Sequence, residues 1–153
     1  MSKHYWLMKT EPSVFSIDDL QKQQKAWWDS IRNYQARNFM MKDMQVGDEI
    51  LIYHSSAEPP GVAGLAKVSQ LAKPDPVQFD KTSDYFDPKA SKEKPIWFCV
   101  QIEYVSKLKN FVPIEQLRAE PKLKDLLALK RGQRLSIQPV SEKDFNFIKK
   151  LGG

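Results

Sequence analysis

The feature that most limits the fold is the segment of residues 96–108, in which side chains alternate between an apolar face and a mixed face. Strand side chains point alternately to the two faces of a sheet, so this alternation predicts a strand. A strand needs hydrogen-bonded neighbours, and shorter runs at residues 4–9, 49–54, 62–71 and 134–138 supply them. The chain is therefore expected to fold around one sheet, with residues 96–108 in a central position.

Capping residues and apolar spacing predict helices around this sheet. Ser16, followed three residues later by Asp19, is a capping-box start for a helix to about residue 25. Further helices are expected after Asn33, at residues 114–119 and 123–129, and after Ser141. Residues 49–54 and 62–71 should pair antiparallel, and residues 72–95 should form a long surface loop. The sequence thus predicts a single domain over residues 1–153 of the α+β class, a mixed sheet or small barrel with peripheral helices.

Length and composition exclude several classes of protein. The chain has 153 residues, 41% of them hydrophobic and 28% charged, which is typical of a globular domain. Its one cysteine, Cys99, cannot form an intramolecular disulfide, and with only two histidines a metal site is not expected. We expect no metal, no cofactor and no membrane segment, and a location in the cytoplasm. The net charge of +5 suits a polyanionic partner.

Tryptophan is the more informative residue type, because exposed aromatic rings on a basic surface can stack on nucleobases. Trp27 and Trp28 are neighbours, so in an extended segment one ring faces the interior while the other faces outward or lines a cavity. The alternative is that both rings are buried by helix packing. The polar and aromatic run at residues 29–35 stands at an expected helix N-terminus, where it could read the hydrogen-bonding edge of a base.

Other residues with reactive side chains have plainer interpretations beside the functional ones. His54 and Ser55 end a strand, where a histidine often satisfies backbone groups, but they could also line a pocket. Cys99 alternates within an apolar strand and is expected to be a small core residue. Residues 118–134 are rich in Lys and Arg, which indicates either a solvated helix surface or a contact with a phosphate backbone.

Five sequence blocks, in this order, resemble those of the EVE domain family: YWLMKTEP, WDSIRNYQARN, GDEILIYHSS, GVAGLAKV and RLSIQPVS. The resemblance covers the chain from Tyr5 to the terminal helix. It implies a PUA-like fold related to the YTH domain, which reads methylated adenine in RNA. It also implies a reader of modified nucleobases that takes a flipped base into an aromatic-lined pocket. Modified cytosine in DNA is the usual suggestion for this family.

The resemblance also implies which residues form the pocket. Trp28 is the expected stacking wall, and Gly64 would let the base approach closely. The full set expected to bind the ligand is Trp6, Lys9, Thr10, Trp28, Asn33, Tyr34, His54, Ser55, Gly64, Ser136 and Gln138. The nucleic-acid backbone would be held by Arg32, Arg37, Lys130, Arg131 and Arg134. Thr10 and Ser30 stand where the family commonly has serine and glycine.

Three functions are consistent with these residues. The leading one is a non-catalytic module that recognises a modified nucleobase in DNA or RNA. The alternative is an enzyme that acts on a small nucleotide or modified base and transfers protons through Lys9, Glu11 or His54. The third is an RNA-binding or assembly module whose pocket is not used.

Overall fold

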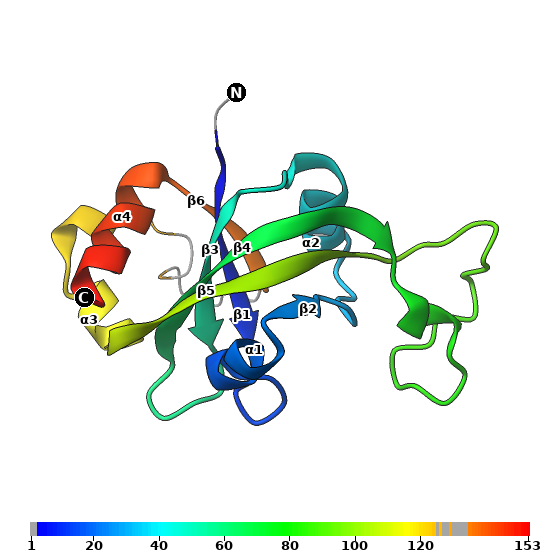
Figure 1. The fold of residues 1–153 in the computed structure, drawn as a ribbon, viewed down its shortest axis with the longest axis horizontal. Helices are drawn as coiled ribbons and strands as arrows, with labels where there is room; N and C mark the ends of the chain where they lie inside the picture. The colour runs from blue at the N-terminus through cyan, green and yellow to red at the C-terminus, as the bar shows by residue number, and fades with distance from the viewer. Residues whose placement is uncertain (1–2, 125, 127–128, 130–134) are drawn as a thin grey trace.

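The structure is a computed structural model that describes residues 3–124, 126, 129 and 135–153. Its centre is a six-stranded sheet in the order β2-β5-β4-β3-β1-β6. The strands are β1 (Tyr5–Thr10), β2 (Lys25–Trp27), β3 (Glu49–His54), β4 (Gly61–Pro74), β5 (Phe98–Pro113) and β6 (Ile137–Val140). β1 and β3 are parallel, and the other neighbours are antiparallel. The sheet is mixed and, within the described residues, open, with β2 and β6 at its edges (Figure 1).

Short helices surround the sheet, as the capping residues predict. They are α1 (Ile17–Gln23), α2 (Tyr34–Asn38), the π-helical turn η1 (Phe39–Asp43), the 3₁₀ turns η2 (Pro76–Phe79) and η3 (Pro121–Leu123), α3 (Ile114–Arg118) and α4 (Glu142–Leu151). The predicted caps are confirmed: Ser16 and Asp19 form a reciprocal capping box, and Asn33 and Ser141 accept hydrogen bonds from the first turns of α2 and α4.

Each face of the sheet carries its own apolar core, because successive strand residues point to opposite faces. In β1, Met8 packs in a first cluster with Trp28 and the α1 residue Ile17, whereas Leu7 packs in a second cluster with the α4 residue Phe145. The α+β class and the antiparallel pairing of β3 with β4 are confirmed. Which face a residue occupies decides which other side chains it can reach.

The segment between β4 and β5 projects from one end of the sheet, while α3 and α4 lie at the other end (Figure 1). This segment is anchored more firmly than a surface loop, because Asp75 and Gln78 are fully buried. The Gln78 amide forms hydrogen bonds to the backbone of Ile96 and Trp97, so it joins the two ends of the segment. The prediction of a surface loop was therefore wrong at its base.

Several element boundaries also differ from the prediction. Residues 25–27 form the edge strand β2, so β5 is second from the edge instead of central. The last strand begins at Ile137. The predicted helix at residues 123–129 and the start of the strand expected at 134–138 lie partly outside the described residues. In the described part of the chain, no helix is both long enough and apolar enough to span a membrane.

Candidate functional site

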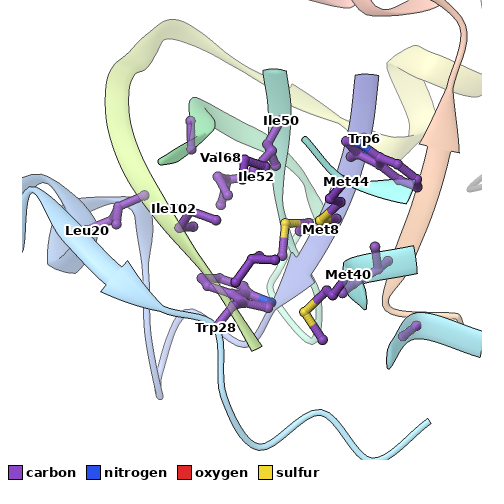
Figure 2. Close-up of a cluster of buried hydrophobic side chains, with 14 of the residues drawn as sticks. Trp6, Met8, Leu20, Trp28, Met40, Met44, Ile50, Ile52, Val68 and Ile102 are labelled. Carbon is purple, nitrogen blue, oxygen red and sulfur yellow. The ribbon is translucent and has the colours of Figure 1, made fainter. Parts of the chain in front are cut away.

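Trp28 lies directly after β2 and belongs to the core on the α1 side of the sheet. Its backbone N–H donates to the carbonyl of Val100 at 2.8 Å, which extends the pairing of β2 with β5. Its ring is 8% exposed and meets Phe15 edge-on at 5.9 Å. Figure 2 shows the ring at the border of the cluster, with Met8 and Met40 nearby. Trp27 points elsewhere, since the Lys73 ammonium lies 4.0 Å from its ring, so the predicted alternation is confirmed.

The indole N–H of Trp28 sets it apart from two other tryptophans. The N–H of Trp6 donates to Asp48 at 3.0 Å, and that of Trp97 donates to Asp87 at 2.8 Å. Among the described residues, the Trp28 N–H has no hydrogen-bond acceptor. The nitrogen is not among the buried, unpartnered side-chain atoms of the described residues, so this N–H reaches solvent at the border of the cluster. A ligand with an acceptor atom at this border could bind it.

The ends of β1 and β3 hold the turn that carries Phe15 against Trp28. The Thr10 hydroxyl donates to the carbonyl of Phe15 at 2.7 Å, and the Ser55 N–H donates to the carbonyl of Thr10 at 2.9 Å. The His54 Nε2 accepts a hydrogen bond from the backbone N–H of Ile17 at 3.1 Å. Thr10, His54 and Ser55 are thus brought together around the turn that places Phe15 against Trp28, and their hydrogen bonds there are structural.

Lys9 and Gln138 lie on the opposite face of the sheet from Trp28. The Lys9 ammonium is 5.6 Å from the ring of Tyr53, which belongs to the second core, and burial lowers the pKa of Lys9. Gln138 is 1% exposed; its amide N–H donates to the carbonyl of Leu135 at 2.7 Å, while its Oε1 has no partner. Because the sheet separates them from Trp28, these two residues do not share one pocket wall with it.

Two further predicted residues contribute to the fold in ways the sequence does not reveal. The Ser136 carbonyl accepts from the backbone N–H of Lys9 at 2.8 Å, which continues the line of β6. A Cβ atom on Gly64 would lie 2.4 Å from the side chain of Ile17, so the close approach at Gly64 is made by α1. The expectation that this space admits a base is therefore not supported.

Trp6 faces the same core as Trp28 and packs against Phe39 at 5.2 Å between ring centroids. It lines a hollow of about 400 Å³ that also includes residues of the β1 start, η1, β6 and the α4 start. The hollow contains none of the other ten residues predicted to bind the ligand. Trp6 therefore does not join the group around Trp28.

The segment after Trp28 is fixed to the projecting segment by the buried carboxylate of Asp75. One oxygen of Asp75 accepts from the Ser30 N–H at 2.7 Å and from the Arg32 guanidinium at 3.0 Å. The backbone N–H of Asp75 donates to the carbonyl of Trp97 at 2.9 Å. Ser30 adopts a positive φ of 65°, a conformation that glycine would adopt at lower cost. Burial raises the pKa of the neighbouring Asp29.

Arg32 and Arg37, expected to contact phosphates, already form hydrogen bonds within the protein. Arg32 donates to the carbonyl of Tyr85 at 2.8 and 3.0 Å, and Arg37 donates to the carbonyl of Ile96 at 3.0 Å. They keep their positive charge and could still attract a polyanion. Lys130, Arg131 and Arg134 lie outside the described residues.

Sequence reasoning missed Asp75, Gln78 and Trp97, the residues that anchor the projecting segment. The pair Asp75-Pro76 is a recognisable start signal, because Asp75 Oδ1 accepts the Val77 N–H at 2.7 Å with proline at the first position of the turn. That signal could have located the turn. It could not have shown that the same carboxylate binds Arg32, which lies 43 positions away.

The residues of the enzyme alternative are not brought together. Adjacent positions of β1 and β3 place Lys9 against Tyr53 on one face, whereas His54 binds the start of α1 on the other. Glu11 is exposed. Within the residues that the structure describes, no group of three or more His, Cys, Asp or Glu side chains could hold a metal ion. Cys99 is buried as predicted, and burial raises the pKa of its thiol to about 12.

The chain is similar to known proteins over nearly its whole length. A family model described as the EVE domain matches residues 4–151. The mouse protein Thymocyte nuclear protein 1 is 40% identical over 167 aligned positions, which cover 97% of this chain and 73% of the mouse protein. The sequence likeness therefore extends over nearly the whole chain and is not confined to single motifs.

Solved structures share the fold over the same extent. A hypothetical protein from Leishmania major superposes with a TM-score of 0.92 at 47% identity, covering 99% of this chain and 95% of that chain. The human THYN1 protein, solved in complex with DNA that contains 5-methylcytosine, superposes with a TM-score of 0.91 at 38% identity over 98% of each chain. The mixed sheet with peripheral helices is thus the fold of these relatives.

Proposed function

The chain belongs to the EVE domain family, and from that premise we propose that it binds DNA carrying a modified cytosine, with the modified base held beside Trp28. The observation that carries this proposal is the likeness, over 98% of both chains, to the human THYN1 protein solved with 5-methylcytosine DNA. A shared fold alone would not support a shared ligand. A likeness of 38% identity over 98% of both chains adds support, because the two chains then resemble each other in sequence as well as in fold.

The position of Trp28 supports the proposal from this structure. Its ring borders the turn held by Thr10, and its indole N–H has no acceptor among the described residues. A cytosine base carries acceptors on its hydrogen-bonding edge, so it could accept from this N–H. The Asn33 side chain uses its oxygen to cap α2, which leaves its amide nitrogen to donate to the same base.

The gain from stacking a base on an aromatic ring is similar in size to the cost of extruding that base from a duplex, so a base that is easy to extrude is favoured. Stacking on an aromatic ring contributes about 1–3 kcal/mol per base, whereas removing a base from a duplex costs a few kcal/mol. Net affinity then depends on edge hydrogen bonds and on phosphate contacts made by a chain of charge +5. Phosphate contacts release counterions, so binding should weaken steeply with salt.

The same site suggests how the base is bound and whether any reaction takes place. We propose a binding module without catalysis, since the geometry separates Lys9 from His54. Thr10, Trp28 and Asn33 form the proposed base site. Trp6, Lys9, Gly64 and Gln138 stay predictions that the arrangement does not favour. RNA as the natural polymer and a cytoplasmic location also stay predictions.

The experiment is a fluorescence anisotropy titration with short labelled duplexes that carry either cytosine or 5-methylcytosine at one position, at two salt concentrations. We expect tighter binding of the methylated duplex and weaker binding of both duplexes at higher salt. Trp28→Phe keeps a ring but removes the N–H, and should reduce the preference for the methylated duplex. Trp27→Phe is the matched control and should leave the preference unchanged. Equal affinity of the unmutated protein for the cytosine duplex and the 5-methylcytosine duplex contradicts the proposal.

A further inference from the structure

Tyr34 has an exposed aromatic ring that stacks on a buried and firmly held residue, Trp97. The ring is 58% exposed and stacks on Trp97, with 4.8 Å between centroids and an angle of 29° between ring planes. Trp97 is 5% exposed and cannot turn freely, because its indole N–H donates to Asp87 and its backbone is held by the Gln78 amide. One face of the Tyr34 ring is therefore held against Trp97, and the ring is exposed to solvent.

The outer face of the Tyr34 ring is not covered by its nearest cation. The Arg37 guanidinium lies 4.8 Å from Tyr34 and 5.9 Å from Trp97. If Arg37 covered the outer face, its distance from Trp97 would approach the sum of the two 4.8 Å separations. Because 5.9 Å is far shorter, Arg37 lies on the same side of Tyr34 as Trp97. It contributes positive charge beside the ring and leaves the outer face open.

The Tyr34 ring stacked on Trp97, here called the platform, has a fixed position relative to Trp28. Asp75 binds the Ser30 N–H, two residues after Trp28, and also binds the carbonyl of Trp97 beneath Tyr34. Arg32, between Ser30 and Tyr34 in the chain, lies 5.3 Å from the Trp97 ring. Trp28 and Tyr34 are thus tied to one buried residue, Asp75, through its carboxylate on one side and its backbone N–H on the other. This gives two aromatic residues, one nearly buried and one exposed, in a constant arrangement.

We propose that Tyr34 stacks the nucleobase adjacent to the modified base on the same strand. This inference rests on the proposed function. Stacking on an aromatic face is tolerant of base identity, so Tyr34 adds affinity without adding preference for a sequence or a modification. The arginines beside the ring favour nucleic acid over an uncharged aromatic partner. Trp28 then selects the modified base, while Tyr34 holds the strand that carries it.

The test measures the affinity of the protein for a mononucleotide and for short strands. The mononucleotide is 5-methyldeoxycytidine monophosphate, and the strands are single-stranded DNA pentanucleotides with cytosine or 5-methylcytosine at the centre. Tyr34→Ala should weaken binding of both pentanucleotides about 5- to 150-fold, the factor that base stacking provides, and leave the mononucleotide unaffected. Tyr34→Phe keeps the ring and should bind like the parent. An abasic position next to the central base should remove the difference between the parent and Tyr34→Ala.

The outcomes separate this inference from the proposed function. Equal parent affinity for cytosine and 5-methylcytosine with a retained Tyr34→Ala effect would contradict the proposed function and leave the platform supported. An equal loss for mononucleotide and pentanucleotide would overturn the platform, because Tyr34 would then belong to the modified-base site. No loss of pentanucleotide binding in Tyr34→Ala would also overturn it.

Discussion

The Asp75 carboxylate is fully buried, and one of its oxygens lies 3.0 Å from Nη1 of Arg32. The Arg32 side chain is 19% exposed, so the ion pair is largely removed from water. Two segments, residues 29–34 and residues 75–97, meet at this pair. Both proposed contacts with DNA, at Trp28 and at Tyr34, depend on Asp75 for their relative position.

Replacing Asp75 should cost much of the stability of the protein. Asp75→Asn leaves the Arg32 charge without its partner in a nearly buried position, a change that typically costs about 3–5 kcal/mol. Urea unfolding followed by circular dichroism would measure this loss. The matched control is Asp18→Asn, which breaks an ion pair of similar length, 2.9 Å to Lys107, between side chains more than half exposed. The control should cost less than about 1 kcal/mol. Equal costs for the two variants would contradict this account.

Cys99 should be inert in the folded protein. Burial raises the pKa of its thiol to about 12, so almost no thiolate exists near neutral pH, and the side chain has no exposed surface. The thiolate is the reactive form. A disulfide reagent added at neutral pH should modify Cys99 only as fast as the protein opens, and promptly in urea. Rapid modification of the native protein would show that β5 is not packed as described.

His54 should make stability depend on pH. Burial lowers the pKa of His54 below its ordinary 6.5, and its Nε2 accepts the Ile17 N–H only when unprotonated. The unfolded chain therefore binds more protons, and stability rises with pH in this range. The contribution is fully present above pH 6.5 and is lost as the pH falls through the lower folded pKa.

The measurement for His54 is the free energy of unfolding one unit above and one unit below pH 6.5. The parent should lose more stability on acidification than His54→Gln, which carries no titrating group at this position. His4→Gln serves as the control, because His4 is exposed and its Nδ1 lies 3.2 Å from the Asp43 carbonyl and 3.9 Å from the Asp48 carboxylate, away from the start of α1. If the parent and His54→Gln show the same pH dependence, the hydrogen bond from Ile17 does not stabilise the fold.

Local signals in the sequence predicted the local structure well. The caps at Ser16, Asn33 and Ser141 start helices as expected, because a capping side chain and the N–H it binds lie within a few residues of each other. The alternation in β3 also placed Leu51 and Tyr53 in one core and Ile50 in the other. These features need no knowledge of distant contacts.

The arrangement of the candidate site could not be predicted from such signals. Lys9 and Thr10 are adjacent in the YWLMKTEP block, yet the strand geometry sends Lys9 to the Tyr53 face and places Thr10 near Trp28. The resemblance predicted a set of pocket residues without indicating which face of the sheet each one occupies. Asp75 joins Arg32 and Ser30 over more than forty positions, and a pattern read along the chain carries no record of such a contact.

The central claim is that the modified base binds at the Trp28 indole, and the most direct measurement is a ¹⁵N–¹H spectrum of the tryptophan indole N–H groups during titration with 5-methylcytosine DNA. Signals would be assigned with Trp→Phe variants. The Trp28 signal should move most, since its N–H gains an acceptor, while the Trp6 signal should stay in place because its N–H already donates to Asp48. Binding of the DNA without movement of the Trp28 signal would contradict the account.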